Sequence, residues 1–237
     1  MCTLVLLHRP GAPWPVLLAA NRDEMLGRPW QPPAAHWPKL PGVIGGRDSL
    51  AGGTWLAVNA HAMVAGVLNR SGSLGPQDGK RSRGDLPLMA LRHPTAAQAA
   101  AEAATWDAGA WRSFNLIVAD PVHAYFIRGL GQGAAQVTWL PEGLSMVTAT
   151  DPNDGAHPRV ARHLPRFQQA ETPNPPDWKD WPNLLADNGG DWDQALNVPP
   201  RQGFGTASAA LIAIRPERTE YMFTEGPPGQ TAFRSVG

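Results

Sequence analysis

The stretch MCTLVLLHRPGAPWPVLLAANRDE, residues 1–24, contains two apolar runs on either side of a short turn-forming segment. Residues 3–9 and 16–20 have the composition of β-strands, and the Pro-Gly-Ala-Pro segment at 10–13 is typical of a turn. The stretch therefore predicts an antiparallel hairpin. With the turn centred between residues 12 and 13, we expect Cys2 to lie opposite Asp23, beside the polar run 21–24.

Cys2 is the only cysteine among the 237 residues, and it directly follows Met1. If Met1 is removed, Cys2 carries a thiol and a free α-amino group. That amine, with a pKa of roughly 7.7–8.0, can accept the proton of the thiol, so that one residue supplies both nucleophile and base. The alternative interpretation is that Cys2 is a small apolar residue at the start of a strand.

The overall composition excludes several classes of partner. Lys and Arg together number 20, as do Asp and Glu, so the chain lacks the positive charge that nucleic acids or anionic membranes require. One cysteine excludes an internal disulfide, and the seven histidines show no spacing typical of zinc sites. Neither a signal peptide nor an apolar run of about 20 residues is evident, which predicts a cytoplasmic protein without stable membrane insertion.

Further strand pairs are expected at 54–59 with 62–68, at 114–119 with 123–128 and at 205–214 with 221–224, with another strand at 144–149. Helices are expected at 95–105, with Thr95 as N-cap, at 158–170 and at 178–187. This pattern predicts an α+β fold in which two antiparallel sheets stack and helices lie outside, with residues 1–237 forming one domain. The ten tryptophans fit core packing or, alternatively, the walls of a site for a planar or acyl ligand.

Several polar residues are candidates for chemistry near Cys2. Asp23 could hold the α-amino group, and Arg22 could lower the pKa of the thiol or bind an anion. The second hairpin places Gly52 and Gly53 beside Asn69, where they could form a donor pair for an oxyanion. The alternatives are a charged strand end at 21–24 and two tight turns at the glycines.

Six segments in this order resemble the NRDE family, to which the eukaryotic Transport and Golgi Organisation protein 2 belongs. They are LAANRDE at 18–24, Arg28-Pro29, GGTWLAV at 52–58, AGVLNRSG at 65–72, SRGDL at 82–86 and FNLIVAD at 114–120. The resemblance implies the αββα sandwich of the N-terminal-nucleophile hydrolases. It also implies a relationship to penicillin V acylases and conjugated bile acid hydrolases, which open a linear amide with an N-terminal cysteine.

The resemblance carries over residue by residue, with three departures. The Arg-Asn-x-Asp motif of those hydrolases falls on residues 20–23, so Asn21 and Asp23 match while Ala20 stands at the Arg position. Their oxyanion asparagine is matched by Asn69. A Thr-Asn-Asn-Pro-like segment corresponds to residues 149–152 without an asparagine at the matching place, and Ala207 stands where NRDE proteins commonly have the Arg of Gly-Thr-Arg.

Two functional classes follow from this resemblance. The first is a protein that handles a small hydrophobic or planar ligand, above all haem in intracellular trafficking. The second is an amidohydrolase that acts through Cys2 and requires neither cofactor nor metal. The predicted catalytic residues are Cys2, Asn21, Arg22, Asp23 and Asn69, and the predicted ligand-binding residues are Glu24, Arg28, Gly52, Gly53, Trp55 and Arg70.

Overall fold

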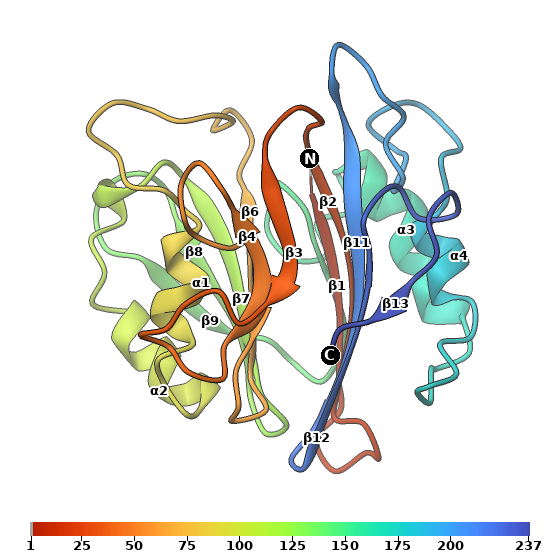
Figure 1. Cartoon of the computed structure of the whole chain (residues 1–237), viewed down its shortest axis with the longest axis horizontal. Coiled ribbons are helices and arrows are strands. Elements are labelled where there is room, and N and C mark those ends of the chain that lie inside the picture. Colours follow the sequence, from red (N-terminus) through yellow and green to blue (C-terminus); the bar gives the residue numbers. More distant parts are fainter. Residues whose placement is uncertain (1) are drawn as a thin grey trace.

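The computed structural model describes residues 2–237, which form two stacked antiparallel β-sheets with helices on both outer faces (Figure 1). The six-stranded sheet has the order β10-β1-β2-β11-β12-β13, and the seven-stranded sheet has the order β3-β4-β5-β6-β7-β8-β9. The strands of the first sheet are β1 (Thr3–His8), β2 (Val16–Met25), β10 (Gly143–Val147), β11 (Phe204–Arg215), β12 (Arg218–Thr224) and β13 (Arg234–Ser235). The second contains β3 (Trp30–Ala34), β4 (Ile44–Asp48), β5 (Leu56–Val58), β6 (Val64–Asn69), β7 (Phe114–Ala119), β8 (Ala124–Gly129) and β9 (Gln136–Trp139).

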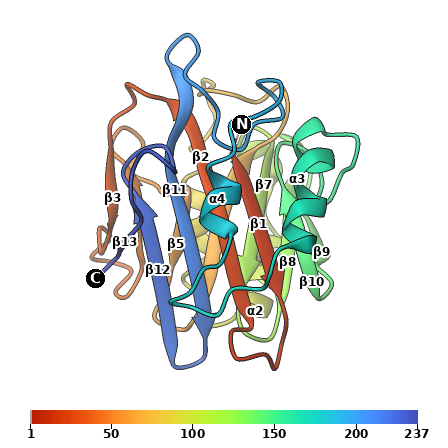
Figure 2. The same cartoon turned by 90° about the vertical axis from the view of Figure 1, so that its right-hand side faces the viewer.

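Three apolar clusters hold the four layers together. The central cluster lies between the sheets and includes Leu4, Leu18, Leu68 and Ile117. A second cluster packs the seven-stranded sheet against α1 (Asp85–Ala90), α2 (Ala96–Ala103) and the short 3-10 helix η1 (Ala108–Ala110). A third packs the six-stranded sheet against α3 (Pro158–Gln169) and α4 (Trp181–Leu185), which cover its outer face in Figure 2. Alternation along each strand sends one set of side chains to the centre and the other to the helices.

The predicted α+β sandwich and its hairpins are confirmed, with local corrections. Strand β2 continues through residues 21–24, so the polar run belongs to the strand and does not mark its end. The helix at 95–105 forms as α2, and the Thr95 side chain accepts a hydrogen bond from the Gln98 amide. The helix expected at 178–187 is confined to α4, because residues 178–180 form a turn in which Lys179 has φ of 51°.

A β-bulge interrupts the pairing of β2 with β11. Asp23 pairs with Thr206 and Arg22 pairs with Ser208, so that Ala207 is the extra residue. A bulge changes which face the following side chains occupy. Here Thr206 lies on the helix-covered face, where it contacts Asp23, although residue 208 two positions later belongs to the face between the sheets.

None of the helices formed by residues 2–237 is long and apolar enough to cross a lipid bilayer.

Candidate functional site

Cys2 lies immediately before β1, the strand between β10 and β2. The register pairs Thr3 with Asn21, one residue away from the expected register, and the Cys2 thiol donates to the Asp23 carbonyl oxygen at 3.5 Å. Burial, together with the negative charge of Asp23, raises the pKa of the thiol. The predicted removal of Met1 concerns a residue outside the described part of the chain.

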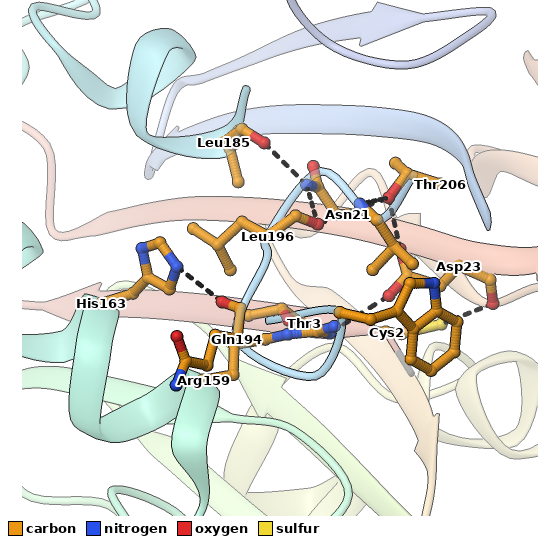
Figure 3. A network of polar contacts seen from close by, with 12 residues as sticks. Cys2, Thr3, Asn21, Asp23, Arg159, His163, Leu185, Gln194, Leu196 and Thr206 are labelled. Carbon is orange, nitrogen blue, oxygen red and sulfur yellow. Dashed lines mark hydrogen bonds and ion pairs between the residues drawn. The ribbon is translucent and has the colours of Figure 1, made fainter. Parts of the chain in front are cut away.

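The alternation of β2 divides its polar run between the two faces of the sheet. Asn21 and Asp23 project toward the helices, and Arg22 projects toward the space between the sheets. The Asn21 amide nitrogen donates to the carbonyl oxygens of Leu185 and Leu196, each at 2.9 Å (Figure 3). Asn21 was predicted to be catalytic, and here its side-chain amide connects β2 by hydrogen bonds to α4 and to the loop that follows α4.

Asp23 is buried in an ion-paired network that holds it next to the N-terminal residues (Figure 3). Its Oδ1 accepts from the Thr206 hydroxyl at 2.7 Å, and its Oδ2 lies 3.1 Å from Arg159 Nη1. The same Arg159 nitrogen donates to the Thr3 hydroxyl at 3.1 Å, and Arg159 is only 1% exposed. Sequence reasoning did not identify Arg159, because α3 lies far along the chain from Asp23 and carries no local signal for this contact.

Arg22 lies on the opposite face, against two tryptophans. Its guanidinium carbon is 4.2 Å from the ring centroid of Trp55 and 6.0 Å from that of Trp30. Its Nη2 is 3.7 Å from Glu24 Oε2, and burial lowers the pKa of Arg22. Arg28 lies 4.0 Å from the same carboxylate oxygen and 2.7 Å from Asp48, so Glu24, Arg28 and Trp55 form one group with Arg22.

Cys2 and Arg22 line a small hollow between the two sheets. Its walls are mainly apolar and come from both sheets. The lining residues are Cys2, Thr3, Leu4, Ala20, Asn21, Arg22, Trp55, Leu56, Val67, Leu68, Ser208, Ala209, Ala210 and Phe223.

The N–H of Gly52 is not available for the oxyanion donor pair considered for Gly52 and Gly53. It donates to the Asp48 carbonyl oxygen at 2.8 Å and is therefore occupied, while the Gly52 carbonyl oxygen accepts from Trp37 Nε1. Gly53 allows close packing, because a Cβ placed there would lie 2.5 Å from the carbonyl carbon of Gly84. Gly53 thus allows its strand connection to pack closely against Gly84, the residue before α1.

Asn69 and Arg70 lie at the end of β6 and directly after it. Asn69 ends β6 opposite Phe114 and is not among the lining residues. Arg70 Nη1 donates to Asn115 Oδ1 at 2.6 Å and to Asp151 Oδ1 at 2.7 Å. The Asn115 amide nitrogen also donates to the carbonyl oxygens of residues 148 and 150. Because Asn115 belongs to β7 and residues 148–150 follow β10, these hydrogen bonds connect the two sheets.

Arg83 is a second cation that the site prediction omitted, although the SRGDL segment contains it. Its Nη1 donates to the carbonyl oxygens of Ser73 and Ser113, at 2.6 and 3.2 Å. Burial, aided by the nearby Arg112, lowers the pKa of Arg83 to about 10, whereas the proximity of Cys2 and Glu24 acts in the opposite direction. Arg83 therefore contributes positive potential on the side of the thiol.

The chain has the fold of several enzymes of known structure. It aligns with the Caenorhabditis elegans N-acylethanolamine-hydrolyzing acid amidase ortholog at 13% identity and a TM-score of 0.56, over 92% of this chain and 94% of that one. A mutant of conjugated bile acid hydrolase from Clostridium perfringens aligns at 12% identity and a TM-score of 0.57, over 100% and 92% of the respective chains. Penicillin V acylase from Agrobacterium tumefaciens aligns at 13% identity and a TM-score of 0.53, over 95% and 83%. At such identities the likeness shows the fold alone.

Family membership comes from the sequence itself. No curated protein matches the chain. The family described as Transport and Golgi organisation 2 matches residues 1–226, which include Cys2, the polar run on β2 and all strands except β13. The protein therefore belongs to the Transport and Golgi organisation 2 family, on a fold shared with N-terminal-nucleophile hydrolases.

Proposed function

We propose that the protein is an amidohydrolase that uses Cys2 to cleave a linear amide with an apolar acyl group. The observation that carries this proposal is the position of the only thiol, which lies on the wall of the apolar hollow and donates to the backbone carbonyl oxygen of Asp23. A nucleophile needs access to the substrate and a nearby group that accepts its proton. The names of the structurally similar proteins, an acid amidase, a conjugated bile acid hydrolase and a penicillin V acylase, also support this choice.

The hollow indicates the substrate class. Leu4, Leu56 and Leu68 contribute aliphatic walls, and Trp55 and Phe223 contribute aromatic ones. Such walls bind a hydrocarbon acyl chain through burial of apolar surface, at roughly 25 cal/mol per Å². The amide group would then lie near Cys2, where the lining becomes polar.

The proposed reaction has two steps. In the first, the Cys2 sulfur forms a bond to the amide carbonyl carbon, the thiol proton passes to the α-amino group, and the carbonyl π electrons move to the oxygen. When the oxyanion collapses, the C–N bond breaks and the leaving amine takes the proton from the α-ammonium group. In the second step, water attacks the thioester with the α-amine as base, which releases a carboxylic acid and restores the thiol.

Asp23 serves this reaction as a positioning residue. Its carboxylate is fixed by Thr206 and Arg159, and the same Arg159 nitrogen contacts the hydroxyl of Thr3, the residue after Cys2. We expect it to hold the α-ammonium group through charge-assisted hydrogen bonds. The buried Arg159, whose Nη1 lies 3.1 Å from Asp23 Oδ2, keeps the Asp23 carboxylate oriented for that contact.

The test combines intact mass with turnover of fatty-acyl amides. The purified chain should lack Met1, and Cys2→Ala should abolish hydrolysis while the control Ser145→Ala retains it. Ser145 is buried in β10 of the same sheet but does not line the hollow. Retention of Met1, or full turnover by Cys2→Ala, would contradict the mechanism.

A second candidate is the binding and handover of a hydrophobic ligand such as haem. The observation in its favour is the aromatic group beside the hollow, in which Trp30 packs edge-on against both Trp55 and Phe223 at centroid distances of 5.8 Å. Haemin titration provides the test. Saturable binding with a Soret shift that Cys2→Ala alters would support this role, whereas the absence of a shift would exclude haem as the ligand.

A further inference from the structure

Two side chains leave polar atoms unpaired inside the otherwise apolar hollow. Arg22 Nη1 and Ser208 Oγ are buried and have no hydrogen-bond partner among residues 2–237. Arg22 is 5% exposed and Ser208 is 1% exposed. Because buried polar groups are almost always hydrogen-bonded in native proteins, two such atoms in one hollow indicate a place for a ligand atom.

The bulge at Ala207 explains why these two residues lie together. Arg22 and Ser208 are direct partners across β2 and β11, so their side chains project from the same face of the sheet. The extra residue lets Thr206 contact Asp23 on one face while Ser208 joins Arg22 on the other. Without the bulge, Thr206 and Ser208 would share a face, and one of these pairs would be lost.

The chemistry of the pair suits an oxygen atom that gains negative charge. The guanidinium lies against Trp55 and its Nη2 lies near Glu24, so the position of the group is fixed, and Nη1 still has hydrogen atoms to donate. The Ser208 hydroxyl is a second donor. Asn21 Oδ1 is also unpaired, but an amide oxygen only accepts hydrogen bonds and cannot stabilise an oxyanion.

We propose that Arg22 and Ser208 form the oxyanion site that stabilises the tetrahedral intermediate at Cys2. This inference rests on the amidohydrolase function proposed above. As the sulfur bonds to the carbonyl carbon, the π electrons move to the carbonyl oxygen, which receives hydrogen bonds from Arg22 Nη1 and Ser208 Oγ. Fixed donors in a water-poor site stabilise such a charge strongly, and Asn69 lies outside the lining of the hollow.

An alkyl trifluoromethyl ketone is a suitable probe, because a thiol adds to it and gives a stable tetrahedral adduct. Addition forms the S–C bond and converts the ketone oxygen to an oxyanion or, after protonation, a hydroxyl. Fluorine NMR against pH then reports the pKa of that hydroxyl. We expect Ser208→Ala and Arg22→Met to raise this pKa by about two pH units each, equivalent to a roughly hundredfold loss of oxyanion stabilisation.

Kinetics and thermal unfolding complete the test. Ser208→Ala should reduce kcat about a hundredfold with little change in KM. Its melting temperature should stay the same or rise, because the substitution removes an unpaired buried hydroxyl, and Ser145→Ala serves as the matched control. Adduct formation with an unchanged hydroxyl pKa in both variants would overturn the oxyanion site alone. Failure of the wild-type chain to form an adduct would overturn the amidohydrolase function itself.

Discussion

At the scale of single residues, the strongest constraint on the site is the buried ion pair between Asp23 and Arg159. Both side chains are essentially inaccessible to solvent, at 0% and 1% exposure. Removing one member of such a pair leaves the other charge in a low-dielectric environment, which typically costs about 3–5 kcal/mol. We therefore expect Arg159→Met to lower the free energy of unfolding by an amount in this range, measured by urea denaturation.

Arg162 provides the matched control on the same helix. It pairs with Asp187 at 3.4 Å but is 35% exposed, so Arg162→Met should cost no more than about 1 kcal/mol. Equal losses in the two variants would show that burial does not distinguish the two ion pairs.

His163 makes stability depend on pH. Its Nε2 is 2.8 Å from the Gln194 carbonyl oxygen, which can only accept, and its Nδ1 is 3.2 Å from Arg166 Nη1, which can only donate. These partners fix a neutral imidazole. Burial lowers the pKa of His163 from 6.5 to about 4. The hydrogen bond to Gln194 and the charge of Asp187 act in the opposite direction, and the charges of Arg166 and Arg162 add to the lowering.

Between those two pKa values the unfolded chain binds a proton that the folded chain does not. Stability from His163 is therefore complete above about pH 6.5 and is lost as the pH falls toward 4, by at most about 3 kcal/mol. Urea unfolding of wild type and His163→Gln over this window checks the prediction. The exposed His61→Gln is the control, and a wild-type pH dependence that survives in His163→Gln would contradict it.

At the scale of secondary-structure elements, the close contact between residue 53 and α1 sets the position of the second sheet beside the hollow. A Cβ on Gly53 would lie 2.5 Å from the Gly84 carbonyl carbon and 2.6 Å from its oxygen, and backbone atoms cannot move aside cheaply. We expect Gly53→Ala to destabilise the fold by about 1–3 kcal/mol in thermal or urea unfolding. Gly27→Ala, where nothing lies within 4 Å of the added Cβ, should be near neutral.

Local patterns explain which elements the sequence predicts. The β1–β2 and β7–β8 hairpins follow from apolar runs separated by turn residues, and their register is accurate to one residue for β1–β2. Strands β3 and β4 were not predicted, since Pro32-Pro33 and Gly45-Gly46 have low strand propensity. The bulge at Ala207 depends on simultaneous contacts to both faces of β11, which no local pattern encodes.

The candidate site likewise combines contacts within one hairpin with contacts between distant segments. Cys2 and Asp23 could be brought together from hairpin geometry, because both belong to one pair of neighbouring strands. Arg159, Thr206 and Ser208 reach this place through long-range packing, so their contribution requires the folded chain.

At the scale of the whole molecule, the hollow lies at the boundary between the two sheets and takes lining residues from each. A ligand held there contacts both layers and binds only when they are stacked, so it stabilises the folded state by mass action. At a concentration of one hundred times Kd the gain is about 2.7 kcal/mol. For a chain of this length, that corresponds to a rise in melting temperature of roughly 5–10 °C.

The Cys2→Ala variant allows this measurement with an uncleaved fatty-acyl amide. We expect its melting temperature to rise in this range as the amide approaches saturation. Adding Ala20→Leu to Cys2→Ala places extra carbon atoms on the wall of the hollow, and this double variant should show a shift of a few degrees or less. Ala104→Leu, in an exposed position after α2, is the control and should keep the full shift. An equal rise in both double variants would mean that the acyl chain binds elsewhere on the protein.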